Sequence, residues 1–209
     1  IATIWWSFLN RELGMARCTW CGQDPIYVDY HDHVWGRPQG DSLHLFEKLC
    51  LDGQQAGLSW ITVLKKQANY QRLFAQFQPT EIVLFDDAKV ESLMQDAGII
   101  RNRLKIHSII RNANAYLKLE SEGVVFSEFL WAFVGGAPLQ NSLEAPSNII
   151  VTSPESDAMS KALKKAGFNF VGSTIVYAFM QAVGMVNDHL VSCPQHNQCA
   201  ALADTLELT

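Results

Sequence analysis

Eight cysteine and histidine residues lie in two short windows of the sequence. The chain has 11 such residues among 209, and these eight fall within residues 18–33 and 189–199. They are Cys18, Cys21, His31 and His33, and then His189, Cys193, His196 and Cys199. Zinc prefers four thiolate or imidazole ligands, so two ligands from each window would tie the two segments together and add folding free energy.

The spacing of these residues favours zinc, but it is compatible with two alternatives. Buried thiols with histidines on the surface would also place these residue types in the chain. Cys18 and Cys21 have the C-x-x-C spacing of a redox pair, but they lack the strand and helix context that this motif requires. Spacing alone leaves open which four of the eight residues bind the metal.

Aromatic rings and carboxylates occur together in two further segments. YVDYHDHVWG (27–36) combines two tyrosines with aspartates, and LDGQQAGLSW (51–60) combines Trp60 with Asp52. Rings can stack on the faces of a nucleobase while a carboxylate accepts a hydrogen bond from its amino group. Core aromatics beside loop aspartates would show the same composition. The two segments are therefore candidate parts of a base-binding pocket.

A run of basic residues begins directly after a glycine turn. The segment MQDAGIIRNRLKIHSII (94–110) predicts a helix that ends near Gly98, a tight apolar turn, and a second helix. The first turn of the second helix would offer N–H groups to an anion, and Arg101, Arg103 and Lys105 add positive charge there. This combination suits a DNA phosphate, although an ordinary helical hairpin with a solvated charged face has the same pattern.

Composition excludes several classes of protein. Apolar residues make up 48% of the chain and charged residues 18%, which is not the composition of a disordered segment. The net charge of −5 and the pI of about 5.6 argue against a uniformly basic nucleic-acid binder but allow a local basic patch. Five cysteines in a chain of this length are not a disulfide scaffold, and they favour a reducing, cytoplasmic setting.

Helical periodicity dominates the segments that must position these residues. Apolar residues recur at spacings of three and four, and Asp41, Ser59, Asp86 and Ser153 are placed to cap helices. The helix that follows Ser59 is expected to continue to Phe77. These patterns predict an all-α fold.

Three segments need separate interpretation. Residues 149–152 are the one candidate β-strand. Residues 166–187 carry no charge and are long enough to cross a bilayer, but their glycines and polar side chains favour a buried helix in a soluble bundle. Residues 1–14 precede Met15, and we expect them to be an extension upstream of the natural start.

Several motifs together closely resemble the DNA-3-methyladenine glycosylase I family. The resemblance runs from about Met15 to Cys193 and includes two very specific motifs, GQQAGLSWITVLKK (53–66) and the NDH-x-x-x-C pattern from Asn187. The others are RCTW (17–20), DPIYVDYHDHVWG (24–36), QDAGIIRNRLKI (95–106) and SKALKKAGFNFVG (160–172). This family belongs to the helix–hairpin–helix DNA glycosylases, so the resemblance implies an all-α fold with that motif at about residues 87–118.

The resemblance also implies roles for individual residues. The structural zinc of the family would be held by Cys18, His31, His189 and Cys193. The base pocket would contain Trp20, Tyr27, Tyr30 and Trp60, with Asp52 as the catalytic acidic residue. The hairpin over Ala97 to Arg103 would contact DNA, with Gly98, Ile100, Arg101, Arg103 and Lys105 as the DNA-binding residues. The chain departs at Asp52 from a family member that has a glutamate at the corresponding position, so the carboxylate of this chain has a stem one methylene shorter.

The resemblance implies a base-excision repair enzyme that acts on alkylated double-stranded DNA. It would flip the damaged nucleotide, hydrolyse the N-glycosidic bond of 3-methyladenine and leave the strand intact. We expect a monomeric cytoplasmic enzyme with one structural Zn²⁺ ion and no membrane partner. Its single glycosylase domain would span residues 15–196, with zinc-binding segments at 15–36 and 186–196 and a tail at 197–209.

Two other functions remain open from the residues alone. A zinc-stabilised DNA-binding protein without catalysis would keep the hairpin and the metal but would need no aromatic pocket with a carboxylate. A zinc hydrolase would require an open metal position, whereas four protein ligands close the site.

Overall fold

The computed structural model describes residues 17–148 and 150–209, and the chain divides into two units. The first unit contains Ala137–Ile150, Gln181–Leu206 and the chain up to Pro38. The second unit contains Gln39–Gly136, Val151–Met180 and Glu207–Thr209. The expectation about residues 1–14 falls outside the described residues. Helices dominate both units, which confirms the helical fold class apart from one small sheet.

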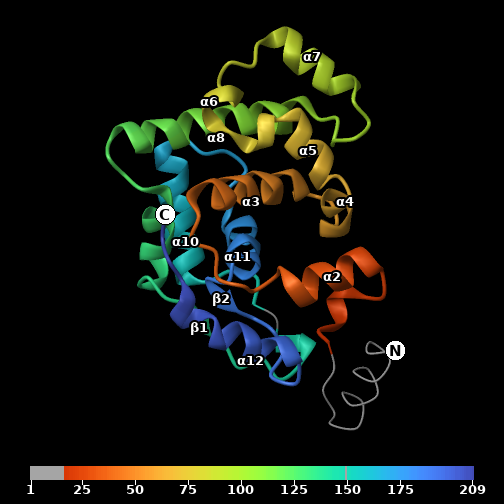
Figure 1. Cartoon of the computed structure of the whole chain (residues 1–209), viewed down its shortest axis with the longest axis vertical. Coiled ribbons are helices and arrows are strands. Elements are labelled where there is room, and N and C mark those ends of the chain that lie inside the picture. The colour runs from red at the N-terminus through yellow and green to blue at the C-terminus, as the bar shows by residue number, and fades with distance from the viewer. Residues whose placement is uncertain (1–16, 149) are drawn as a thin grey trace. The chain divides into compact units, whose positions relative to one another are not determined.

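The second unit is built around the long helix α8 (Arg103–Ser121), which packs against α3, α6 and α7 (Figure 1). Its buried residues Ile106, Ile109 and Ala113 recur at helical spacing, as the periodicity predicts. The other helices that lie wholly in this unit are α3 (Ser42–Gln55), α4 (Trp60–Leu64), α5 (Gln67–Leu73), η2 (Ala75–Phe77), α6 (Pro79–Ile82), α7 (Asp87–Gln95), α9 (Phe126–Trp131), η3 (Ala132–Val134) and α10 (Pro154–Ala166).

Predicted caps begin three of these helices. The Asp41 carboxylate accepts a hydrogen bond from the backbone N–H of His44 at the start of α3, and Asp86 caps α7 in the same way. Ser153 forms a capping box with Ser156 at the start of α10, where Pro154 occupies the first helical position. These starts are confirmed because each cap satisfies a backbone donor that the helix itself leaves unpaired.

Two helices are shorter than the sequence predicts. The helix expected from Ser59 to Phe77 is divided into α4, α5 and η2. Lys66, between α4 and α5, has a φ of −107° and a ψ of −2°, and residues 75–77 have positive φ values that an α-helix excludes. The uncharged segment 166–187 contributes only the ten-residue α11 (Ser173–Ala182). Within the described part of the chain, no helix is both long and apolar enough to cross a membrane.

The first unit contains the only strands found in the described residues. β1 (Leu139–Gln140) and β2 (Val186–Asn187) pair in parallel, and β2 also contacts α12 (Pro194–Ala201) (Figure 1). The expected strand at 149–152 is wrong for residues 150–152, which form none, and residue 149 is not described. The remaining elements are η1 (Thr19–Cys21), α2 (Pro25–His33), η4 (Pro146–Asn148) and η5 (Ala203–Thr205).

Candidate functional site

Four of the eight clustered Cys and His residues converge in the first unit. Cys18 precedes η1, His31 lies in the last turn of α2, His189 follows β2, and Cys193 is the N-cap of α12. All four are buried, and their ligand atoms lie within 4.8 Å of one another. These are the four residues that the resemblance implied, whereas spacing alone had left the set open.

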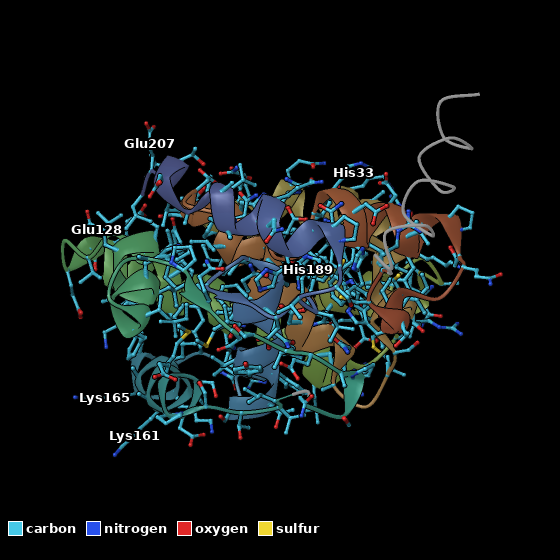
Figure 2. The ribbon with its side chains drawn as sticks, turned by 90° about the horizontal axis from the view of Figure 1, so that it is seen from below. His33, Glu128, Lys161, Lys165, His189 and Glu207 are labelled. Carbon is cyan, nitrogen blue, oxygen red and sulfur yellow. The ribbon has the colours of Figure 1, made fainter. Side chains whose placement is uncertain are left out.

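His33 is exposed and does not belong to the four-residue cluster, although it lies close to His31 in the sequence. His33 and His31 share α2, but His33 lies on the outer side of the helix and contacts Asp29 instead (Figure 2). His189, by contrast, is fully buried among other side chains (Figure 2). Residues two apart on a helix point in different directions, so only one of these histidines reaches the cluster.

The spacing of the four ligand atoms fits a tetrahedral zinc ion. Cys18 Sγ lies 3.6 Å from His189 Nδ1, and Cys193 Sγ lies 3.7 Å from both His189 Nδ1 and His31 Nε2. Zinc bond lengths to sulfur and nitrogen place such ligand pairs about 3.6 Å apart in a tetrahedron. The donor set and its spacing therefore both suit a closed zinc site.

Neighbouring groups orient the ligands of this cluster. His31 Nδ1 donates to Asp32 Oδ1 at 2.7 Å, and His189 Nε2 donates to the Trp35 carbonyl at 3.2 Å. Each imidazole thereby turns its other nitrogen toward the cluster, which is the usual arrangement around a ligating histidine. Arg17 in turn holds the Asp32 carboxylate with two hydrogen bonds from Nε.

The electrostatics of the cluster favour a thiolate at Cys193. A hydrogen bond with Cys18 lowers the pKa of Cys193, and contacts with His189 and His31 lower it further, although burial opposes them. The same contact with Cys193, together with burial, raises the pKa of Cys18. Metals bind the thiolate form, so the protein already stabilises one of the two thiolates that zinc requires.

Three of the predicted base-pocket residues form an aromatic cluster in the first unit. The Trp20 ring centroid lies 5.0 Å from that of Tyr27 and 6.5 Å from that of Tyr30. Trp35 joins them with its ring centroid 4.9 Å from that of Trp20. Trp20 and Trp35 also line a cavity of about 210 Å³ in this unit.

The other two predicted pocket residues, Asp52 and Trp60, belong to the second unit. A buried lysine, Lys48, contacts both of them: its ammonium pairs with Asp52 Oδ1 and lies 4.0 Å from the centroid of the Trp60 ring. Lys48 and Asp52 are one turn apart on α3, and Trp60 begins α4. The sequence analysis missed Lys48, although its i, i+4 spacing from Asp52 was a visible signal.

Asp52 keeps one carboxylate oxygen unused. Only 3% of Asp52 is exposed, and Oδ2 has no hydrogen-bond partner among the residues that the structure describes. Asp52 lines a cavity of about 180 Å³ together with residues of the α3–α4 turn and of α11. Burial raises the pKa of Asp52, and the Lys48 ammonium opposes that rise. A buried acceptor of this kind is available to a ligand that carries N–H donors.

The predicted hairpin lies between α7 and α8, and two of its N–H groups are bonded to side chains of the protein. The Gly98 N–H donates to Asp96 Oδ1 at 2.7 Å, and the Ile100 N–H donates to the Tyr70 hydroxyl at 3.0 Å. A Cβ at Gly98 would lie 2.8 Å from Asp96 Oδ1 and 2.9 Å from Asn69 Cγ, so a larger residue would displace these side chains. Gly98 and Ile100 therefore shape the turn, and their N–H groups are bonded within the protein.

The basic residues of the hairpin differ in exposure. Arg101 and Arg103 are exposed, and Arg103 forms a two-pronged ion pair with Glu91 of α7. Lys105 is a correction to the predicted DNA-binding set, because it is buried and donates to the carbonyl oxygens of Gln54 and Ala56. Those carbonyls end α3, where a positive charge is favourable. Lys105 therefore stabilises the C-terminal end of α3.

A chain of hydrogen bonds connects the hairpin with the end of α3. The Tyr70 hydroxyl accepts from Ile100 and donates to Gln54 Oε1 at 3.3 Å. Gln54 Nε2 then donates to the carbonyl of Lys105 at 3.1 Å. Because Asp52 lies two residues before Gln54, these bonds fix the helix of the buried carboxylate to the hairpin turn.

Solved structures with the same fold are DNA glycosylases. A crystal structure of 3-methyladenine DNA glycosylase I matches with a TM-score of 0.85 and 53% identity, covering 86% of this chain and 98% of that one. A single-residue variant of 3-methyladenine DNA glycosylase I in complex with 3-methyladenine matches with a TM-score of 0.82 and 38% identity, covering 86% and 97%. The class of the protein is therefore that of the DNA glycosylases.

Sequence comparison narrows this class to one family. The family model described as methyladenine glycosylase matches residues 20–196. DNA-3-methyladenine glycosylase 1 of Escherichia coli is 55% identical over 179 residues, which are 86% of this chain and 96% of that protein. The chain belongs to the methyladenine glycosylase family, whose enzymes hydrolyse N-glycosidic bonds. The resemblance drawn from its motifs is thus confirmed.

Proposed function

We propose that this protein hydrolyses the N-glycosidic bond of 3-methyladenine in alkylated double-stranded DNA. One observation carries the proposal: Asp52 lines a cavity and has a buried carboxylate oxygen with no hydrogen-bond partner among the described residues, and Lys48 links this carboxylate to the Trp60 ring. A relative of the same fold binds 3-methyladenine. A buried acceptor and an indole ring are the groups that a flat base with an amino group requires.

The chemistry asks little of the protein beyond recognition. Alkylation at N3 makes the base cationic, so the bond between the base and the C1′ carbon of the sugar breaks with its electron pair leaving on the base. Water then adds to C1′ and loses a proton. Asp52 would accept a hydrogen bond from the base and stabilise its positive charge, and Trp60 would stack on the ring. Asp52 is also a candidate general base for the water.

The hairpin between α7 and α8 is proposed to be the helix–hairpin–helix element that grips DNA. Arg101 and Arg103 carry exposed guanidinium groups that suit phosphate oxygens. Lys161 and Lys165 extend from α10, another helix of the same unit (Figure 2). The contribution of Trp20, Tyr27 and Tyr30 to base binding stays a prediction.

We further propose that base release leaves the DNA strand uncut. Strand cleavage by a glycosylase of this kind needs a neutral amine that attacks C1′. Lys48 is an amine that contacts Asp52, and its ion pair with that carboxylate favours the charged form, although burial lowers the pKa of Lys48.

The four-residue cluster of the first unit is proposed to bind one structural zinc ion. Cys18, His31, His189 and Cys193 would be its ligands, and as a closed site the ion would supply folding free energy. Within the first unit, it would link η1 and α2 to the segment that joins β2 and α12.

The proposed function is tested by incubating methylated duplex DNA with the protein. The released bases are identified by chromatography, and the DNA is examined on a denaturing gel. We expect free 3-methyladenine and intact strands that break only after alkali treatment. A folded protein that releases no base contradicts the proposed reaction, and strands cut without alkali contradict the proposed lack of lyase activity.

A further inference from the structure

Lys48 is a buried cation on α3, between two buried leucines. Only 7% of the residue is exposed, and Leu45 and Leu49 of the same helix are fully buried. Lysine is almost never buried unless its charge is paired, because removing an ammonium group from water is costly. An apolar side chain would serve packing equally well, so packing alone does not account for the charge.

The ammonium group of Lys48 contacts two groups, and both favour a positive charge. It pairs with Asp52 Oδ1, and it lies over the Trp60 ring at 4.0 Å from the centroid. α3 and α4 are consecutive helices that contact each other (Figure 1). The three residues therefore form one buried group within the second unit.

The ion pair leaves the two oxygens of Asp52 in different situations. Oδ1 is engaged by Lys48, whereas Oδ2 has no partner among the described residues. An aspartate held through one oxygen cannot turn freely, so its second oxygen keeps a fixed direction. The side chain of Asp52 is one methylene shorter than that of a glutamate. The long side chain of Lys48 nevertheless reaches the Asp52 carboxylate inside the fold.

We propose that Lys48 is a positioning residue for base release, because its ammonium fixes the orientation and the negative charge of Asp52 so that Oδ2 can accept a hydrogen bond from the base. This inference rests on the proposed function. Lys48 acts through Asp52 and does not itself need to touch the substrate.

The charges around this pair support an action of Lys48 on Asp52. Burial raises the pKa of Asp52, and Lys48 is the charged group that lowers it. Burial likewise lowers the pKa of Lys48, while Asp52 and then Glu47 of the same helix raise it. Glu47 itself accepts from Gln67 and Gln71 of α5.

The other elements that pack against α3 add no competing charge. α4 and η2 contain no ionisable side chain, and Glu128 of α9 is exposed. Lys105 of α8 directs its ammonium to the carbonyls of Gln54 and Ala56. Removing the charge of Lys48 is therefore expected to raise the pKa of Asp52.

The test uses Lys48→Met, which keeps an unbranched side chain, one heavy atom shorter, but removes its charge. We expect the single-turnover rate of 3-methyladenine release at pH 7 to fall about ten-fold or more. The acid limb of the pH–rate profile should lie about one to three pH units higher, because Asp52 then takes up its proton more readily. The Kd for duplex DNA should not change, so the loss falls on the chemical step.

Two further variants separate a role in positioning from a role in packing. Lys48→Arg keeps the charge and should restore the acid limb of the wild-type profile. In an Asp52→Asn background, Lys48→Met should cause no further loss, because the group on which Lys48 acts is already removed. Three results overturn the proposal. The first is a loss of rate in Lys48→Met that is equal at every pH, and the second is a double variant whose losses of rate are additive. The third is a folded Lys48→Arg protein with the pH–rate profile of Lys48→Met.

A measurement without turnover distinguishes this proposal from the proposed function. The carboxyl carbon of Asp52 is titrated by NMR in the wild type and in Lys48→Met, with a higher pKa expected in the variant. Equal pKa values, or an Asp52 that is protonated at pH 7 in the wild type, refute the role of Lys48. If Lys48→Met does not fold, the titration of Asp52 in the wild type still tests the proposal, because a protonated Asp52 at pH 7 refutes it. A wild type that releases no base refutes instead the proposed function.

Discussion

Two buried polar clusters lie in the two units of this protein, and they differ in what they leave unpaired. In the first unit, the second ring nitrogens of His31 and His189 are bonded to Asp32 and to the Trp35 carbonyl. All four candidate ligands of that cluster then face one another. In the second unit, the ion pair of Lys48 and Asp52 leaves Asp52 Oδ2 without a partner among the described residues. A cluster that satisfies itself stabilises a fold, whereas an unpaired acceptor is available for chemistry.

The largest expected effect is on the stability of the first cluster. Cys193→Ala should lower the free energy of unfolding by about 4 kcal/mol or more, since it removes a zinc ligand. Bound zinc, measured by atomic absorption, should fall from one ion per chain to none. Folded molecules of the variant should still release 3-methyladenine.

Cys199→Ala is the matched control for that variant. Cys199 is also a buried cysteine, with 2% exposed, but it lies outside the four-residue cluster. This control should keep its zinc and lose only about 1 kcal/mol of stability from the small cavity. If Cys193→Ala kept full zinc and full stability, the first cluster would not be a metal site.

In the second cluster, a substitution should affect the rate of base release more than the stability of the fold. Asp52→Asn should still fold, at some cost in stability because buried Lys48 loses its charged partner. It should slow base release by about 1 to 3 kcal/mol in barrier height, because a buried charged contact becomes a weaker neutral one. Single-turnover kinetics measure this loss. Asp29→Asn, at an exposed aspartate of α2, is the control and should behave as wild type. An unchanged rate in Asp52→Asn would falsify the assigned role.

A smaller effect on stability and DNA binding is expected from the hydrogen bonds that connect the hairpin with Gln54 of α3. Tyr70→Phe removes the hydroxyl that links Ile100 to Gln54, at a cost of about 1 to 2 kcal/mol in stability. Its Kd for duplex DNA should rise while its affinity for free 3-methyladenine stays at the wild-type value. Calorimetry and fluorescence anisotropy measure these quantities. Unchanged stability together with unchanged DNA affinity would show that the hydrogen bonds do not hold the hairpin.

The smallest effect is expected at the exposed surface. Arg103→Ala should weaken DNA binding about equally for all sequences and reduce the salt slope of log K by about 1. Its loss is limited because Arg103 already shares its charge with Glu91. Lys118→Ala, near the far end of α8, serves as the control and should leave the slope unchanged. A wild-type slope in Arg103→Ala would remove this residue from the phosphate contacts.

The sequence predicted the parts of the molecule that depend on local rules. Caps at Asp41, Asp86 and Ser153 follow from the unpaired N–H groups of a helix start, and all three are present. Helical periodicity likewise located α8. β1 and β2 could not be predicted because strands of two residues are too short to show alternation.

The parts that depend on tertiary contact were harder to predict. Spacing alone did not select His31 over His33, because only the packing of α2 decides which one turns inward. The sequence predicted Lys105 to be a surface cation, but its ammonium is buried and donates to a backbone carbonyl at the end of α3. Lys48 was missed because a lysine between buried leucines is normally exposed, and its partner lies on an adjacent turn.

A structure of the protein with free 3-methyladenine tests the central claim most directly. We predict that the base stacks on Trp60 and donates a hydrogen bond from its amino group to Asp52 Oδ2, with the four-residue cluster closed around its ion. A base that instead ligates the metal held by Cys18, His31, His189 and Cys193, or a cavity at Asp52 that stays empty at saturating base, would contradict it.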